Sequence, residues 1–209
     1  MKVGILGSGD VAQSLAAGFA SRRDDVTVGT GHPDKLAQFA TEHPNVTVGT
    51  FANAARDGEL VVIAVLGDAA VALLGEIGAG AFDGKTVIDT TNPLRFDESG
   101  PQLSVGFTDS LGERIQRQLP NARVVKAFNT VGAPEMVKPS FDGGPPSMFV
   151  AGNDADAKRI AGDVLHDFGW DVVDLGGIEA SRYLEPMCMA WINYGARSGQ
   201  WHHAFKMLR

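Results

Sequence analysis

A glycine-rich turn near the start of this chain of 209 residues constrains its fold more than any other feature. The run Lys2-Val3-Gly4-Ile5-Leu6 leads directly into Gly7-Ser8-Gly9-Asp10-Val11-Ala12, after which apolar residues recur at helical spacing. In a strand–turn–helix context, Gly7 permits the tight turn, Gly9 lets a pyrophosphate approach the backbone, and Ala12 keeps the helix close to the sheet. Free amides at the helix start then receive phosphate charge. The pattern predicts a dinucleotide site that includes Gly7, Ser8, Gly9, Asp10 and Val11.

Strand and helix signals alternate along most of the chain. Short apolar runs bounded by Gly, Pro, Asp or Asn recur between helical patterns, and the run at 60–65 does not alternate with polar residues. A continuous apolar run is typical of a strand covered on both faces of a parallel sheet. We therefore expect a single α/β domain of the Rossmann type, with a doubly wound, mostly parallel sheet and a C-terminal helical segment. The segments 96–103 and 134–146 are expected to be surface loops.

Composition excludes several classes of protein. With 18 Lys and Arg against 25 Asp and Glu, the net charge of −7 disfavours binding to nucleic acid or to an anionic membrane surface. No apolar run approaches the roughly 18 residues needed to span a bilayer. The single cysteine, Cys188, permits neither an internal disulfide nor a multi-cysteine metal site, and no metal site is expected. Because the chain starts on a strand, with no room for a signal peptide, we expect a cytoplasmic protein.

The end of the second strand indicates which dinucleotide is bound. An NAD-binding domain carries an acidic residue there for the ribose hydroxyls, but this chain has Thr30, Gly31 and His32, followed by Pro33 and Lys35. The Thr30 hydroxyl, the amides of Gly31 and His32, and the Lys35 ammonium suit the 2′-phosphate of NADP(H). A capped helix start with a solvated Lys35 is the alternative interpretation.

Two further polar segments follow strands. Asn92 lies in the segment 90–94, and Asn129 and Thr130 lie in the segment 126–132. Loops at the carboxyl ends of parallel strands surround the ligand crevice, so these side chains are candidate partners of the nicotinamide and its ribose. Turn formation explains the Asn-Pro step at 92–93 equally well.

No residue pattern for acid–base or nucleophilic catalysis is evident. Lys126 and Tyr183 have no recognisable partner, and Cys188 between two methionines is expected to be a packing residue. His202 and His203 are expected to point in different directions on a helix, which disfavours a shared metal site. We assign no catalytic residue. Hydride exchange between two redox cofactors needs little beyond face-to-face positioning, because each cofactor supplies its own electronics.

The last part of the chain changes character. Apolar residues between Ala180 and Ile192 form a helical stripe, and no strand pattern follows 178. We expect residues 1–175 to form the dinucleotide-binding part and residues 176–209 to pack on it as part of one domain. The helix either belongs to the core alone or also covers a ligand or a second subunit, and a homodimer built on it is the expected assembly.

Several motifs together resemble the F420-dependent NADP oxidoreductase family, whose fold the STEAP ferric reductases also use in their cytoplasmic domain. The motifs occur in matching order along essentially the whole chain, and the block Gly176–Pro186 is the most distinctive. They are Gly7–Ala12, Gly29-Thr30, Asn92-Pro93-Leu94, Ala127–Thr130, Met148–Asp154 and Gly176–Pro186.

The resemblance implies reversible hydride transfer between NADPH and a flavin-like acceptor, in the type member the deazaflavin F420, with the last helix covering the second site. It places Gly9, Asp10 and Val11 at the pyrophosphate, and Thr30, Gly31 and Lys35 at the 2′-phosphate. It also places Ala64, Val65 and Leu66 beside the nicotinamide ribose. The family commonly has Arg where this chain has Gly31. Two alternatives stay open: a non-catalytic NADP-binding sensor or interaction protein, and a reductase of a small imine or carbonyl substrate.

Overall fold

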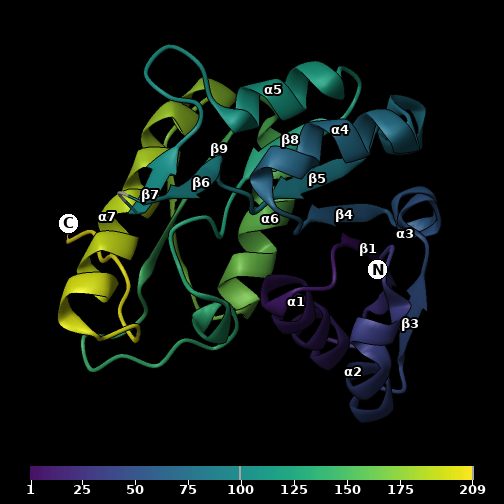
Figure 1. Ribbon diagram of the computed structural model, residues 1–209. Helices are drawn as coiled ribbons and strands as arrows, with labels where there is room; N and C mark the ends of the chain where they lie inside the picture. Colours follow the sequence, from purple (N-terminus) through teal and green to yellow (C-terminus); the bar gives the residue numbers. More distant parts are fainter. Residues whose placement is uncertain (99, 209) are drawn as a thin grey trace.

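A twisted sheet with helices on both faces organises the chain (Figure 1). The computed structural model describes residues 1–98 and 100–208, and within these residues the main sheet has eight strands in the order β10-β9-β8-β5-β4-β1-β2-β3. The strands are β1 (Lys2–Leu6), β2 (Asp25–Gly29), β3 (Val46–Gly49), β4 (Leu60–Ile63), β5 (Thr86–Asp89), β8 (Arg123–Lys126), β9 (Ser147–Gly152) and β10 (Asp171–Asp174).

Six of these strands, from β3 through β8 in the sheet, run parallel to one another. The chain builds outward from β1 to β3 and then returns to β4, so the strand order reverses between β1 and β4. In a doubly wound sheet this reversal opens a crevice at the carboxyl ends of the two strands. Strand β9 runs antiparallel to β8, and β10 runs parallel to β9. The predicted Rossmann-type, mostly parallel sheet is confirmed.

Helices cover the two faces of the sheet and separate its apolar residues into two main cores. Helices α1, α2 and α6 pack on one face, and α3, α4 and α5 pack on the other. The helices are α1 (Asp10–Ser21), α2 (Ala37–Glu42), α3 (Phe51–Asp57), α4 (Gly67–Ile77), α5 (Leu111–Gln118), α6 (Ala155–Asp167) and α7 (Ser181–Ser198). Short 3-10 turns are η1 (Pro33–Leu36), η2 (Ala79–Phe82), η3 (Ala133–Glu135) and η4 (Ile178–Ala180).

Strand β4 shows why the central apolar runs do not alternate with polar residues. Leu60 and Val62 contribute to the core under α1 and α6, whereas Val61 and Ile63 contribute to the core under α3, α4 and α5. Successive side chains of a strand point to opposite faces, so a strand with a core on each face is apolar throughout.

A small hairpin replaces one expected loop. The segment 96–103 was predicted to be a loop, but strands β6 (Leu94–Asp97) and β7 (Gly100–Leu103) pair antiparallel across it, with Arg95 opposite Gln102. The hairpin is solvated and contains Gly100 and Pro101, so it carries neither the apolar alternation nor the composition of a core strand. It lies between α4 and α7, which places it beside the carboxyl ends of the central strands (Figure 1).

Helix α7 carries the stripe expected near the end of the chain. Leu184 packs with Phe149, Ala151 and Val173 in a third apolar cluster beside β9 and β10. After α7 the chain folds back, so that the amide of Ser147 donates to the carbonyl of Phe205 at 2.8 Å. Among the described residues, no helix is both long and apolar enough to cross a membrane.

Candidate cofactor-binding site

The glycine-rich turn lies at the end of β1, beside the point where the strand order reverses. Gly7 has φ +141°, and a Cβ there would lie 2.2 Å from the carbonyl oxygen of Ala64, the residue after β4. Such a φ favours glycine, and the close approach leaves no room for any side chain. Gly7 therefore lets the ends of β1 and β4 come together at the floor of the crevice.

The start of α1 is open to solvent. Gly9 is the N-cap residue, has φ −81°, makes no side-chain cap and has no atom within 4 Å of the place where a Cβ would be. Gly9 and Asp10 are exposed, and the half-buried Ser8 accepts a hydrogen bond at its carbonyl from the side chain of Gln13 at 3.0 Å. The first amides of a helix lack partners within it, so this end of α1 can receive a phosphate.

The end of β2 lies beside this turn, because β1 and β2 pair from Lys2 with Asp25 to Leu6 with Gly29. Thr30 is buried, and its Oγ1 accepts a hydrogen bond from the His32 amide at 2.9 Å. The His32 amide is thus engaged within the protein, which differs from the expectation that it points at an anion. Gly31, His32 and Lys35 are exposed, and Pro33 opens the 3-10 turn η1 as expected.

Residues 64–66 link β4 to α4 at the same edge. The strand ends at Ile63, two residues before the end of its expected apolar run, because Leu66 already serves as the N-cap of α4. The Ala64 amide donates to the carbonyl of Leu6 at 2.8 Å, which holds the link against the end of β1. Ala64 and Val65 are half-buried, whereas Leu66 has 83% of its surface exposed. An apolar side chain this exposed beside a crevice is available to contact a ligand.

The loops that follow β5 and β8 are joined by their asparagines. Asn92 Nδ2 donates to the Asn129 carbonyl at 2.8 Å, and Asn129 Nδ2 donates to Asn92 Oδ1 at 3.1 Å and to the Leu184 carbonyl of α7 at 2.8 Å. Phe128, the residue before Asn129, has φ +61°, which is uncommon for a residue other than glycine. Asn129 and Thr130 are buried and Asn92 is half-buried. The structure therefore brings together these residues, which were predicted separately.

Behind these loops lies a buried ion network formed by Asp89, Lys126 and Glu185. The Lys126 ammonium lies 2.7 Å from Asp89 Oδ2 and 2.9 Å from Glu185 Oε1, and it donates to the Thr91 carbonyl at 2.8 Å. Burial by itself lowers the pKa of Lys126, but attraction to the two carboxylates outweighs burial, so the pKa is raised and the ammonium stays charged. Its three donors are all used.

Sequence reasoning missed this network. Lys126 was considered a catalytic candidate without a partner, and Asp89 and Glu185 were not singled out. A signal was present, since a lysine between Val124-Val125 and Ala127-Phe128 on a central strand must be paired when it is buried. Its partner on α7 could not be found from local sequence, because Glu185 lies 59 positions further along the chain.

The other candidate groups lie away from the crevice or are committed elsewhere. Burial raises the pKa of the Cys188 thiol to about 12, as suits a packing residue. His202 and His203 lie beyond the end of α7, not on a helix as expected. His202 Nδ1 is 2.7 Å from Glu135 Oε1, and the His203 ring stacks on Trp191. Within residues 1–98 and 100–208, no group of three or more His, Cys, Asp and Glu side chains is arranged to hold a metal ion.

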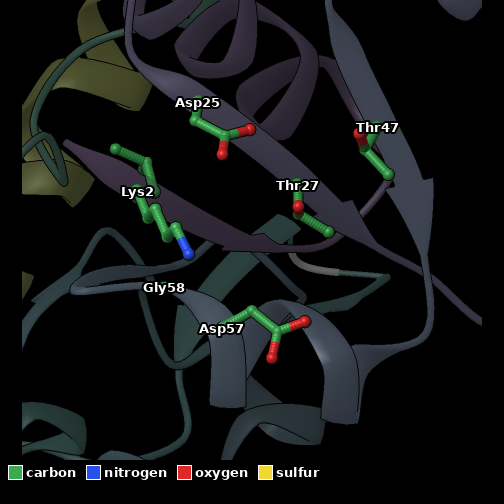
Figure 2. A pocket seen from close by; sticks show the side chains of 7 residues that line it. Lys2, Asp25, Thr27, Thr47, Asp57 and Gly58 are labelled. Atoms are coloured by element: carbon green, nitrogen blue, oxygen red, sulfur yellow. The ribbon is translucent and has the colours of Figure 1, made fainter.

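Two pockets lie at opposite edges of the sheet. One of about 250 Å³ lies at the carboxyl edge beside residue 66, and it is lined by Gly67, Asp68, Val71, Pro93, Arg95, Ser104, Val105, Leu111 and Arg114. Figure 2 shows another, of about 260 Å³, where Lys2 and Asp25 begin β1 and β2 and Asp57 ends α3. Ligands of doubly wound sheets bind at the carboxyl ends of the strands, so the pocket of Figure 2 is not the dinucleotide site.

Comparison with known proteins gives consistent matches. The sequence profile of the family described as "NADP oxidoreductase coenzyme F420-dependent" matches residues 2–93. The crystal structure of a proposed F420-dependent NADP reductase from Arthrobacter sp. FB24 is 40% identical and superimposes with a TM-score of 0.95, with 100% of both chains covered. Metalloreductase STEAP3 of Rattus norvegicus is 28% identical over 185 residues, which cover 88% of this chain and 36% of that protein. This chain thus spans about a third of the length of that metalloreductase.

More distant structures share only the fold. An imine reductase from Pseudomonas sp. is 17% identical, with a TM-score of 0.72 over 95% of this chain and 63% of that one. At this identity the match carries no conclusion about substrate.

Proposed function

The chain belongs to the F420-dependent NADP oxidoreductase family, and on this premise we propose that it transfers hydride between NADPH and a deazaflavin or flavin acceptor at the crevice between β1 and β4. It is an NADP-dependent oxidoreductase. Our proposal concerns the identity of the acceptor and the residues that bind each cofactor.

The single observation that carries the proposal is the convergence of the predicted dinucleotide residues on one edge of the sheet. The open N-terminus of α1, the acid-free end of β2 and the link at 64–66 follow the carboxyl ends of β1, β2 and β4, which are neighbours. We assign the pyrophosphate to Gly7–Val11 and the 2′-phosphate to Thr30, Gly31 and Lys35. The nicotinamide then lies toward Leu66, Asn92 and Asn129, where the Asn92–Asn129 amide pair offers polar partners for the ring's carboxamide.

Three candidates for proton transfer among the described residues, Lys126, His202 and His203, are engaged by partners within the protein, which favours a redox cofactor as the second substrate. Lys126 lies under the crevice loops, but all of its donors are used. The ring of His202 pairs with Glu135, and His203 Nε2 donates to the Trp191 carbonyl at 3.0 Å. Reduction of a carbonyl or imine requires a positioned acid, whereas a bound flavin or deazaflavin supplies its own hydride chemistry. The protein's task is to hold two flat rings face to face.

An acceptor screen tests the proposal. Wild-type protein is mixed with NADPH and, in separate reactions, with oxidised F420, FMN or FAD, and loss of nicotinamide absorbance is followed together with reduction of the acceptor. We expect turnover with at least one of these acceptors. NADPH binding without turnover of any of them would favour a non-catalytic NADP sensor. Lys158→Met serves as a control, since Lys158 of α6 pairs with Asp174 at the end of β10, away from the crevice.

We also propose that α7 forms a homodimer interface. Its outward face exposes 70% of Tyr183 and 51% of Tyr194, with Ala190 between them on the same side. Analytical ultracentrifugation tests this assembly: we expect a dimer that Tyr194→Asp dissociates, and a monomeric wild type at micromolar concentration would refute it.

A further inference from the structure

The ion network of Asp89, Lys126 and Glu185 joins four separate elements at the carboxyl edge of the sheet. Asp89 ends β5, Lys126 ends β8 and Glu185 lies in the second turn of α7. The Glu185 carboxylate also accepts hydrogen bonds from the amides of Leu111 at 3.0 Å and Gly112 at 2.9 Å, which form the first turn of α5. One fully buried carboxylate therefore caps α5 and docks α7 on the strands.

Asp89 is connected through both of its carboxylate oxygens. Asp89 Oδ1 accepts hydrogen bonds from the Thr91 amide at 2.9 Å and hydroxyl at 2.7 Å, while its other oxygen faces Lys126. Two carboxylates and one ammonium leave one negative charge, which the N-terminus of α5 offsets. Buried charges are tolerated only when their geometry is good and their remaining hydrogen bonds are made, so this arrangement leaves little freedom for its members to move.

Helices α5 and α7 also approach each other closely at this point. A Cβ on Gly112 would lie 2.4 Å from Ser181 Oγ, so only glycine allows the observed separation. A second contact, between Arg182 of α7 and Glu113 of α5, lies on the solvent side of the network. The first turns of the two helices thus form one unit fixed to β5 and β8.

This unit is connected directly to the two crevice loops. Lys126 donates to the carbonyl of Thr91, next to Asn92, and Asn129 donates to the carbonyl of Leu184, next to Glu185. A shift of α7 would therefore move Asn92 and Asn129. The phosphate-binding turn is further away, because β4 lies between β5 and β1 in the sheet.

We propose that Lys126 and Glu185 are positioning residues for hydride transfer: they hold α7 and α5 in register with the loops at Asn92 and Asn129, to which the proposed function assigns the nicotinamide. The inference rests on the proposed function. It follows that loss of the network changes the placement of the nicotinamide and the rate of transfer, while the phosphate anchors at Gly7–Val11 keep the affinity for NADPH.

The test compares Glu185→Gln and Lys126→Met with the wild type in three measurements. These are the Kd for NADPH, the emission spectrum and lifetime of the bound nicotinamide, and kcat and KM with the acceptor found in the screen. Phe82→Leu is the matched control, because it removes buried volume in η2 at the amino edge of the sheet without touching the network. All proteins are assayed well below their melting temperatures.

We expect both network variants to bind NADPH within twofold of the wild type, to alter the emission of the bound nicotinamide, and to lower kcat by about 10- to 100-fold, since small misplacements of reacting groups have effects of this size. Phe82→Leu should change none of these values. If Lys126→Met does not fold, Glu185→Gln still decides, because it keeps the size of the side chain and removes only its charge.

Unchanged emission and kcat in a folded Glu185→Gln variant would overturn the proposal, and so would an equal loss of kcat in Phe82→Leu. A wild type that binds NADPH but reduces no acceptor would refute the proposed acceptor alone, and the emission comparison would still decide the role of the network. A wild type that fails to bind NADPH would refute both proposals.

Discussion

Replacing Gly9 with alanine should separate cofactor binding from folding. Gly9 has φ −81°, which alanine adopts freely, and a Cβ there meets no atom of the protein within 4 Å. The loss of backbone entropy in the unfolded chain stabilises such a variant by about 0.4–1 kcal/mol, and alanine as a poorer N-cap costs a similar amount. We therefore expect the free energy of unfolding to change by less than about 1 kcal/mol.

Binding should respond differently, because the added methyl group lies where the pyrophosphate approaches the start of α1. Losing one charge-assisted hydrogen bond costs about 1.5–3 kcal/mol, which weakens binding by about 10- to 150-fold. Isothermal titration with NADPH measures this loss, and chemical denaturation measures stability. Gly80→Ala is the matched control, because Gly80 is equally unobstructed but lies in η2, at the opposite edge of the sheet. A Gly9→Ala variant that binds NADPH within twofold of the wild type would refute the assignment of the pyrophosphate.

Three further predictions concern single side chains. Lys35→Ala should weaken NADPH binding about 2- to 5-fold while leaving NADH binding unchanged, as one exposed point charge on a phosphate would, and equal effects on both nucleotides would argue against a 2′-phosphate contact. Cys188, whose pKa burial raises to about 12, should react slowly with a disulfide reagent at pH 8 until the protein unfolds, and rapid labelling of native protein would contradict its burial. Burial opposes ionisation of Asp109, but hydrogen bonds from Arg117 and Arg114 outweigh it and lower its pKa from 3.8 to about 2. Because the folded-state pKa is depressed, the stabilisation is complete well above pH 3.8 and is lost as the pH falls through about 2, so Asp109→Asn should cost at most about 1 kcal/mol near neutral pH and progressively less as the pH falls to 2 and below. Denaturation of both proteins across this range would refute the pairing if the difference did not shrink.

The sequence was sufficient to predict the architecture, because the apolar pattern of each central strand depends on which of its faces are buried. The unbroken apolar run of β4 reflects a core on each face, and the turn from Gly7 to Ala12 requires a strand before it and a helix after it. The hairpin of β6 and β7 was not predicted, because it has no core on either face. Its residues are largely exposed to solvent, so they have the composition of a turn and not the apolar pattern of a core strand.

Contacts between residues that are distant in the chain could not be predicted from local sequence. Asn92 and Asn129 could each be placed at a strand end, but the hydrogen bonds between them depend on the adjacency of β5 and β8. The same holds for Lys126, which appeared unpaired although both of its carboxylate partners are fully buried beside it. The engagement of the His32 amide by Thr30 is a local hydrogen bond, but sequence does not distinguish it from an amide left free for a phosphate.

Direct transfer of a labelled hydride tests the central claim most directly. NADPH carrying deuterium at the transferable position of nicotinamide C4 is mixed with stoichiometric enzyme and the acceptor identified in the screen. A reduced deazaflavin is analysed by mass spectrometry, whereas a flavin, whose N5 hydrogen exchanges with water, is followed by the rate of a single turnover. We expect one deuterium in each reduced deazaflavin and a slower single turnover than with unlabelled NADPH. Reduced deazaflavin without deuterium, a single turnover of a flavin that deuterium does not slow, or oxidation of NADPH that leaves every acceptor oxidised would contradict the proposal that this crevice passes hydride from nicotinamide to a second cofactor.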